Sequence, residues 1–520
     1  MPGPRDTFFA SLAILTPVLL WNYYRTKSDR KVAHPPSPIS LPLIGNLLSL
    51  PSGPEHVMYM ILGKQLKSDV IYLSLFGHEI VVLNSSEAAS DLLEKRSGLY
   101  SDRFCPLIIT DQNLFNWSTA PTVLGYNDVW RHHRRMLNKW LNVREVSQFH
   151  KVQENQARAL LRRLLGVSTE AHPFNSVKDE VIFSMTSSIF QIVYGYAAQE
   201  KPDPYFQAAH ESDDNAARAA MITSFYVNIF PFLNRIPEWV PGTGWKRTVR
   251  EWRKQKEYAL DAPFRWTQNQ LSQGTYEHSI IADLLQDQSL SSSLTVEERD
   301  IRLKELGHVL FSGGTDTTAL LLLSFIAAMV LNPDVQTRAQ QEIDKNLGHG
   351  TMPQISDRER LPYVNRLILE VLRWRPVLPI AIPHQCFQDD VYRGYQIAKG
   401  TIVIGNVWAI TRDESVYAEP ENFNPDRFLE PNVPPAPAFG WGRRKCPGVY
   451  FGEASLFITV ASLLATFTFS KRRDLNGNYI NPVIENASDS ILLAPKPFEF
   501  EFAPRSDAHR RLINETDPSH

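Results

Sequence analysis

Apolar side chains recur every three or four residues along most of the chain, the spacing that places them on one face of an α-helix. This pattern predicts helices over residues 129–165, 177–196, 252–271, 301–331, 333–347 and 362–373, and another directly after residue 448. Residues 70–84 and 391–405 instead carry β-branched and aromatic runs around a glycine, which predicts hairpins turning at Gly77 and at Lys399-Gly400. The expected fold class is mainly α with a minor β-sheet.

The first 31 residues have a different pattern. Residues 8–24 are almost continuously apolar, and as a helix they would extend about 26 Å, enough to cross a bilayer core. Aromatic residues at the end of this run, with no small-residue cleavage site behind it, favour a retained anchor over a secretory signal peptide. Four basic residues follow, so the positive-inside rule predicts a single-pass anchor with the rest of the chain in the cytosol: Arg25, Lys27, Arg30 and Lys31.

Prolines at residues 32–46 predict a stiff extended connector behind the anchor. Residues 47–504 contain no Gly/Ser-rich linker, charge run or repeat, so we expect one large domain there, followed by a polar tail at 505–520. The net charge of −2 gives no basic field that would favour a nucleic-acid partner. The three cysteines lie far apart, which excludes a disulfide framework and a multi-thiolate zinc site.

Candidate chemistry centres on residues 439–448, FGWGRRKCPG, directly before a predicted helix. Pro447 suits the first position of that helix, which places Cys446 at the positive end of the helix dipole. This position is expected to lower the thiol pKa and to make Cys446 a metal ligand, whereas Cys105 and Cys386 are expected to be small buried hydrophobes. Glycines and an arginine in the loop would allow a flat ring to approach and would bind its carboxylate: Gly440, Gly442, Gly448 and Arg444.

A second candidate is the pair Glu370 and Arg373, whose i, i+3 spacing places both charges on one helix face. Such a pair is usually solvated and contributes little. Here the neighbouring residues are apolar, so we expect the pair to be buried and to need a further partner, which Arg427 in a later loop can supply.

A third candidate lies at residues 311–318, FSGGTDTT, inside an otherwise apolar helix. Two glycines and four hydroxyl groups in mid-helix are costly, which indicates a functional site around Asp316 and Thr317. A helix kink with threonine hydroxyls bonded back to the main chain is the alternative.

The loop at 439–448 resembles the haem-binding signature of cytochromes P450, F-x-x-G-x-R-x-C-x-G, with every fixed position filled. The resemblance implies the P450 fold and heme b (iron protoporphyrin IX) held by the Cys446 thiolate, with four further residues around the ring: Phe439, Gly442, Arg444 and Gly448. It implies that Asp316 and Thr317 relay protons to dioxygen.

Three further parts of the sequence resemble the family more loosely. Glu370, Arg373 and Arg427 are similar to the family's Glu-Arg-Arg triad, which locks the segment that carries the cysteine. The resemblance also assigns the haem carboxylates to Trp130 with Arg134 and to His384. A solvated basic helix face and a surface histidine are the respective alternatives.

The resemblance implies a monooxygenase that inserts one oxygen atom of O₂ into a small apolar substrate. The chain contains no Rossmann or Walker A motif, so electrons from NADPH must come through another protein. That partner would be NADPH-cytochrome P450 reductase, with cytochrome b5 as a second donor, at the endoplasmic reticulum membrane. The sequence is similar to filamentous-fungal P450s of the sterigmatocystin-modifying and indole-modifying groups, which favours secondary metabolism or xenobiotic oxidation.

Two alternatives stay open. The first is a haem-thiolate isomerase or peroxygenase that needs no reductase, against which the Asp316-Thr317 pair argues. The second is a haem-thiolate sensor, which would not need a membrane anchor. By family position, the substrate pocket would include the aromatic residues Phe115, Trp117 and Phe225.

Overall fold

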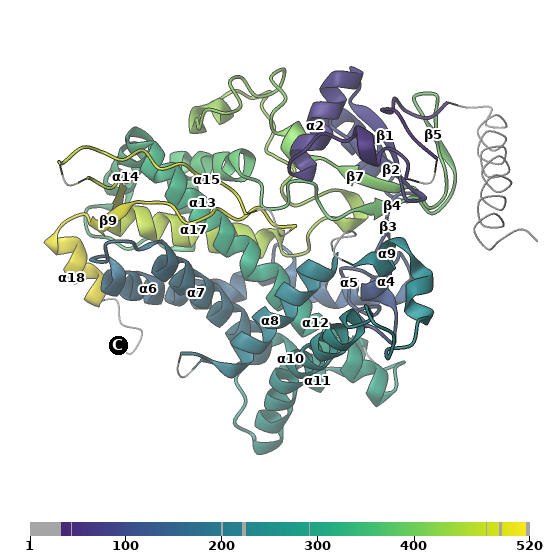
Figure 1. Ribbon diagram of the computed structural model, residues 1–520. Helices are drawn as coiled ribbons and strands as arrows, with labels where there is room; N and C mark the ends of the chain where they lie inside the picture. Colours follow the sequence, from purple (N-terminus) through teal and green to yellow (C-terminus); the bar gives the residue numbers. More distant parts are fainter. Residues whose placement is uncertain are drawn as a thin grey trace, which may run out of the picture. The chain divides into compact units, whose positions relative to one another are not determined.

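The computed structural model describes residues 33–42, 44–198, 201–220, 225–290, 292–474, 476–487 and 491–515. Helices predominate in these ranges and the strands are short (Figure 1), so the predicted fold class is confirmed. The anchor expected at residues 8–24 and its basic flank lie outside the described residues, as do parts of the connector and of the polar tail.

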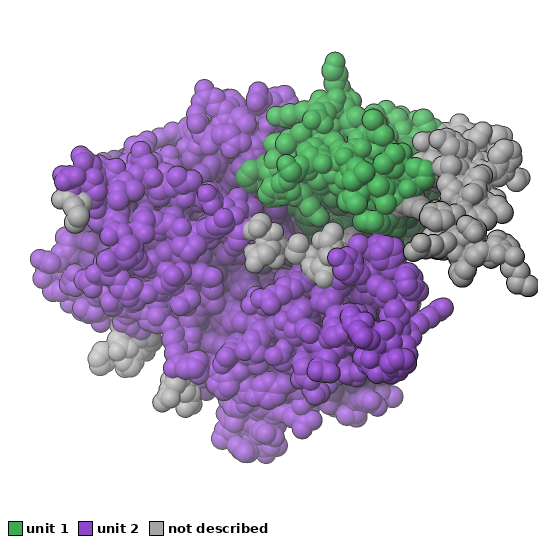
Figure 2. All heavy atoms as spheres, viewed as in Figure 1, with its two compact units in different colours: residues 1–104, 380–410, 441–443 green, residues 105–379, 411–440, 444–520 purple. Residues whose placement is uncertain are grey.

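The chain divides into two compact units, which Figure 2 draws in different colours. Unit 1 consists of the described residues up to Phe104 with Ile380–Ile410 and Trp441–Arg443. Unit 2 consists of Cys105–Pro379, Thr411–Gly440 and the described residues from Arg444 onward. The loop at 439–448 therefore contributes residues to both units, and the single large domain expected over 47–504 stays a prediction.

Unit 1 is built on a five-stranded sheet with the order β1-β2-β7-β4-β3. Its strands are β1 (Val70–Leu75), β2 (His78–Leu83), β3 (Asp102–Arg103), β4 (His384–Gln385) and β7 (Ile402–Gly405). β1 and β2 form the predicted hairpin, and the two turn residues Phe76 and Gly77 have φ values of 48° and 84°, as a tight two-residue hairpin turn requires. Three α-helices accompany the sheet in the part of unit 1 that the structure describes: α2 (Glu55–Leu66), α3 (Ser86–Ala89) and α16 (Val407–Ile410).

The second hairpin differs from its prediction. The strands β5 (Asp390–Tyr392) and β6 (Tyr395–Ile397) pair around Arg393 and Gly394, not around Lys399-Gly400. β7 instead joins the main sheet, parallel to β2 and antiparallel to β4. All four residues of β7 are buried, and a strand that is apolar on both faces is stable in the interior of a sheet.

Unit 2 contains most of the α-helices, both long and short. They are α4 (Leu107–Thr110), α5 (Asp128–Leu141), α6 (His150–Val167), α7 (Phe174–Tyr194), α8 (Pro204–Ala220), α9 (Tyr226–Ile229), α10 (Trp245–Gln273), α11 (Ile280–Gln286), α12 (Val296–Gly314), α13 (Asp316–Leu331), α14 (Pro333–Leu347), α15 (Pro362–Trp374), α17 (Val449–Thr466) and α18 (Asp507–Glu515). A two-stranded antiparallel sheet of β8 (Phe467–Ser470) and β9 (Glu501–Pro504) completes the unit.

Each of the seven predicted helices is present, but two of them are interrupted. The helix expected over 129–165 is α5 followed by α6, because the Asn142 side chain accepts hydrogen bonds from the N–H groups of Arg144 and Glu145 and turns the chain there. The helix expected over 301–331 is α12 followed by α13, with Thr315 between them at φ −87° and ψ −73°. Sequence periodicity did not reveal α2 or α8.

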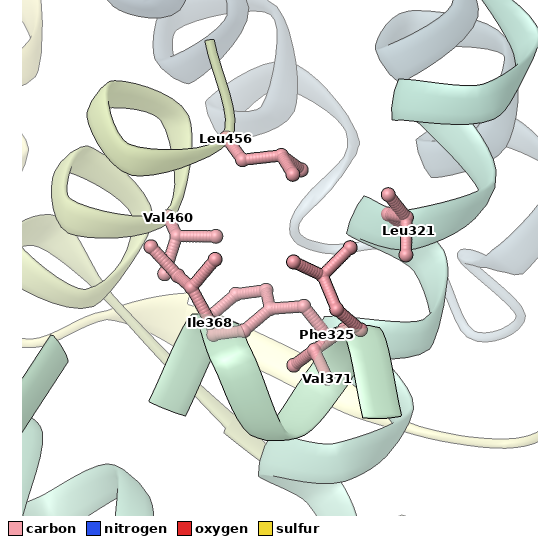
Figure 3. Close-up of a pocket in the computed structure, with 7 residues that line it drawn as sticks. Leu321, Phe325, Ile368, Val371, Leu456 and Val460 are labelled. Carbon is pink, nitrogen blue, oxygen red and sulfur yellow. The ribbon is translucent and has the colours of Figure 1, made fainter. Parts of the chain in front are cut away.

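The core of unit 2 lies where α13, α15 and α17 pack together. A cavity of about 10 Å³ lies there (Figure 3), lined by Leu321, Phe325, Ile368, Val371, Leu372, Leu456 and Val460. A space of that size with hydrocarbon walls offers a water molecule no hydrogen bonds and stays dry. Val296–Leu331 and Val449–Thr466 are apolar enough to cross a membrane, but 72% and 78% of their most apolar stretches are buried in the protein, as in the core helices of a globular fold.

Candidate functional site

The loop that carries Cys446 closes on itself just before α17. The Cys446 N–H donates to the carbonyl of Phe439 at 2.9 Å, and the tight turn inside the loop uses Gly440 at φ 72°. The helix α17 begins at Val449 with Gly448 as its N-cap. The prediction that Pro447 occupies the first helical position is therefore wrong, because the chain makes one more turn before its backbone becomes helical.

Cys446 keeps accessible surface, yet the protein around it desolvates the sulfur. This burial raises the thiol pKa, and the opposing effects of the Gly448 N–H and of the Arg134 charge are smaller. The prediction that the helix terminus lowers this pKa is wrong for the thiol, since Cys446 lies three residues before the helix. An accessible sulfur in a desolvating environment suits a metal, whose own charge deprotonates a coordinating thiol.

Two guanidinium groups flank the Trp130 ring on α5. Arg134 lies 5.5 Å and Arg444 4.3 Å from the ring centroid. Arg134 also donates to the carbonyl of Lys445 at 2.8 Å, and Arg444 donates to the carbonyl of Leu124 at 2.6 Å. The structure thus brings Trp130, Arg134 and Arg444 together beside the cysteine loop, and the alternative of a wholly solvated basic helix face is wrong.

Burial lowers the pKa of Arg134, which the Cys446 charge opposes. An anionic carboxylate would relieve the desolvation of such a cation, so the donor set fits a ring that carries carboxylates.

The remaining loop residues pack in different ways. Phe439 lies against α17, where a Cβ on Gly452 would come 3.7 Å from its ring, and a Cβ on Gly448 would come 3.8 Å from the Cys446 sulfur. Gly442 belongs to unit 1, and at φ +53° a Cβ there would come within 2.3 Å of the Leu93 carbonyl oxygen. Gly442 is therefore required by the packing of unit 1, a reason that the sequence did not reveal.

Glu370, Arg373 and Arg427 form one buried cluster. Arg373 donates to both Glu370 oxygens at 2.8 Å, and Arg427 Nε reaches the same carboxylate at 3.0 Å. Glu370 and Arg373 are fully buried and Arg427 is 7% exposed. The remaining N–H groups bind main-chain carbonyls, for example Pro420 O at 2.8 Å from Arg373. The expected burial and the expected third partner are both present.

Asp316 and Thr317 lie at the start of α13. The Thr317 hydroxyl donates to the Gly313 carbonyl at 2.7 Å, so the back-bonded geometry foreseen as the alternative is present. Gly313 is exposed and nothing lies within 4 Å of a Cβ built on it, whereas a Cβ on Gly314 would come 2.6 Å from Ile189. The surface of the helix thus has free space beside Gly313 and is tightly packed at Gly314.

Asp316 is a carboxyl group with a strongly perturbed pKa. Burial, and then the charges of Asp213 and Asp214, raise its pKa to about 7. A carboxyl that titrates near neutrality can hold and release a proton under physiological conditions.

His384 lies on β4 in unit 1 and is 4% exposed, so the alternative of a surface histidine is wrong. Its Nδ1 contacts the Tyr100 carbonyl at 2.6 Å. If Nδ1 carries the proton of that contact, Nε2 can donate to a carboxylate only when the imidazole is protonated.

The expected pocket aromatics are largely core residues. Phe115 is fully buried and packs against Trp117 and Trp252, and Phe225 also packs against Trp252.

Sequence reasoning missed two histidines that contact acids near Asp316. His210 Nδ1 lies 3.6 Å from Asp316, and His308 Nε2 lies 2.9 Å from Asp213. Both contacts involve a residue of α8. Because α8 was not predicted, no local sequence pattern indicated either contact.

Comparisons with known proteins agree with this geometry. The cytochrome P450 family model matches residues 35–502. The chain is 35% identical over 500 residues to cytochrome P450 monooxygenase 98 of Postia placenta, covering 94% of this chain and 93% of the relative. It is 32% identical over 495 residues to tryptamine 4-monooxygenase of Psilocybe cyanescens, covering 93% of this chain and 95% of the relative. A solved zebrafish cytochrome P450 with progesterone aligns with a TM-score of 0.71 at 24% identity, covering 87% of this chain and all of the other.

Proposed function

The chain belongs to the cytochrome P450 family and is a haem-thiolate monooxygenase, and we propose that Cys446 supplies the sulfur ligand to its haem iron. The observation that carries this proposal is the environment of Cys446, an accessible sulfur with the Gly448 N–H and the Arg134 charge beside it. Both neighbours stabilise a thiolate, and each leaves the sulfur open to a metal.

Around that ligand, Arg134, Arg444 and Trp130 would hold the carboxylates of heme b, and Phe439 and Gly448 would border the ring. The haem supplies the oxidative chemistry, which splits O₂ with two electrons and two protons and transfers one oxygen atom to the substrate. Glu370, Arg373 and Arg427 keep the main chain at 418–424 in place, because their N–H groups and carboxylate bind it at several points.

Asp316 and Thr317 are proposed to move protons at the site. Asp316 titrates near neutrality, so it can take a proton from solvent and give it up again. The Thr317 hydroxyl donates its proton to the Gly313 carbonyl and thereby turns its oxygen lone pairs outward, where they can accept a hydrogen bond.

Electrons are proposed to arrive from NADPH through NADPH-cytochrome P450 reductase, with cytochrome b5 as a second donor. Basic side chains on α5 support a docking site for an acidic partner, since Arg131 and Arg135 are exposed and Lys139 is 37% exposed. Lys445, also exposed, lies beside α5 because Arg134 binds its carbonyl. Such a site would speed association at low ionic strength.

Eukaryotic members of the family are typically associated with membranes, and we place this chain at the endoplasmic reticulum with its haem portion in the cytosol. Exposed aromatic residues around α9 support contact with a lipid surface: Tyr226, Phe230, Phe232 and Trp239 are 73%, 44%, 60% and 83% exposed. Large exposed rings of this kind suit the membrane interface, where their apolar faces meet lipid.

The substrate is proposed to be a small apolar molecule of secondary metabolism or a xenobiotic. One relative is named for the oxidation of tryptamine, an indole amine, so aromatic amines come first in a substrate screen, before terpenoids and polyketides.

The test of the axial ligand is Cys446→Ser, with Cys386→Ser as the matched control. Cys386 is 1% exposed and burial raises its pKa to about 11, which excludes it as a thiolate ligand. We expect the first variant to lose the red-shifted Soret band of the reduced CO complex and the second to keep it. Retention of that band by Cys446→Ser would disprove the assignment.

A further inference from the structure

Asp316 has a basic partner on a helix far away in the sequence. His210 Nδ1, on α8, lies 3.6 Å from Asp316 Oδ1, and both side chains are 28% exposed. Among the residues that the structure describes, no other basic side chain lies within 4 Å of this carboxylate. A small rotation of either side chain closes the distance to that of a hydrogen bond, as catalytic contacts often require.

The other ring nitrogen of His210 also has a hydrogen-bonding partner. Its Nε2 lies 3.0 Å from the hydroxyl of Thr186, a fully buried residue on α7. A threonine hydroxyl can either donate to Nε2 or accept from it, so the contact persists with the proton on either ring nitrogen. The imidazole can therefore change its protonation without losing its orientation.

The titratable and charged groups around this contact come from three helices. Lys178 on α7 and the pair Asp213 and Asp214 on α8 act on Asp316, and His308 on α12 contacts Asp213 at 2.9 Å.

The other helices against α13 contribute apolar side chains around the cavity of Figure 3, such as Ile368 from α15 and Leu456 from α17. His210 is thus the group best placed to exchange a proton with Asp316.

We propose that His210 is a positioning residue for Asp316: its imidazole orients the carboxyl group and passes a proton to it at Oδ1. In this step the N–H bond at Nδ1 breaks and an O–H bond forms on Asp316, so that imidazolium and carboxylate become neutral imidazole and carboxylic acid. Solvent then returns a proton to the partly exposed imidazole. The inference rests on the proposed role of Asp316 in proton delivery.

The pKa values agree with such an exchange. Burial lowers the pKa of His210, against the charges of Asp213 and Asp214, while that of Asp316 is raised to about 7. The imidazolium is therefore no weaker an acid than the carboxyl group, so transfer of the proton from His210 to Asp316 costs little free energy.

The test compares His210→Gln with His278→Gln in the full-length, haem-loaded protein. Glutamine keeps a donor and an acceptor for Thr186 and Asp316 but cannot be protonated. His278 is the matched control, because it makes the same kind of contact with Asp283 at 3.4 Å while its side chain is 73% exposed. Thr186→Val, which removes only the hydroxyl behind Nε2, is the second variant if His210→Gln fails to bind haem.

The first readout is the infrared carboxylic-acid band of Asp316, assigned by its loss in Asp316→Asn and followed against pH without turnover. We expect His210→Gln to shift the midpoint by about one pH unit, since the carboxyl group loses the imidazole that exchanges a proton with it. An unchanged midpoint in His210→Gln, or in Thr186→Val where that variant replaces it, would overturn the proposal. Equal shifts in His278→Gln would also overturn it.

The second readout is the ratio of product formed to NADPH consumed between pH 6 and 8. We expect about a tenfold lower ratio near pH 7 in His210→Gln and none of this loss in the control. Wild-type coupling in His210→Gln would mean that hydrogen bonding alone suffices and that no proton passes through the imidazole. A wild-type protein that forms no product with NADPH and reductase would instead refute the proposed function, while the infrared titration still decides the contact between His210 and Asp316.

Discussion

Replacing Glu370 by Gln tests whether the buried cluster stabilises unit 2 by its charge. Glutamine has the shape of glutamate, so the change removes the charge with little change in volume. Arg373 and Arg427 would then be two buried cations whose only acceptors are neutral. Breaking a buried ion pair from one side costs about 3–5 kcal/mol, because an uncompensated charge stays in a medium of low dielectric constant.

That free energy corresponds to a measurable fall in the melting temperature. Unfolding entropy is about 2.1 cal/mol/K per residue, or about 1.1 kcal/mol/K for a chain of 520 residues. The melting temperature of Glu370→Gln should therefore fall by about 3–5 °C, and the haem content after expression should fall with it.

The assay is thermal unfolding followed by circular dichroism, with haem content measured on the same samples. Glu251→Gln is the matched control, because Glu251 and Lys254 have the same i, i+3 spacing at 3.2 Å but are 61% and 72% exposed. An exposed pair contributes about 0–1 kcal/mol, so this variant should melt within about 1 °C of the wild type. If Glu370→Gln also melts within that margin, the main-chain carbonyls alone compensate the two arginines and the reasoning fails.

Four other outcomes are expected. Thr317→Ala should keep haem and the CO band but divert electrons to hydrogen peroxide, so that less product forms per NADPH. Unchanged coupling would mean that the hydroxyl serves only the hydrogen bond to the Gly313 carbonyl. Burial raises the pKa of Asp316 from 3.8 to about 7, so the wild type loses stability as the pH rises through that range. The melting temperature of Asp316→Asn should therefore rise relative to that of the wild type between pH 5 and 8. Arg134→Leu should lower haem content, unlike Arg131→Leu on the exposed face; equal effects would contradict the carboxylate role. Deleting residues 1–31 should release the protein from membranes in a flotation assay with its haem retained, whereas loss of haem would overturn the division at the connector.

Local sequence patterns were sufficient for the chemistry that depends on near neighbours. The loop at 439–448 and the helix behind it were predicted from ten consecutive residues, and the burial of Glu370 with Arg373 followed from apolar neighbours on one helix. The hairpin at Gly77 was equally local, because its turn needs two residues with positive φ.

Patterns that depend on distant contacts were predicted less well. The loop at 391–405 has two possible turns, and only the pairing of β7 with β2 and β4 selects Arg393-Gly394. The direction of the Cys446 pKa was wrong because desolvation depends on all surrounding atoms, whereas the helix terminus is visible in the sequence.

The sequence by itself determined the helical fold class and named the candidate residues for haem binding and for proton transfer. Only the tertiary structure decided which of them meet: it joined Arg427 to a pair more than fifty residues earlier, set two guanidinium groups on Trp130 and brought His210 to Asp316. The physical reason is the distance along the chain over which each kind of interaction acts. Periodicity and capping act over three or four residues, but the contacts that shift a pKa or orient a carboxylate come from packing between helices that the chain brings together only when it folds.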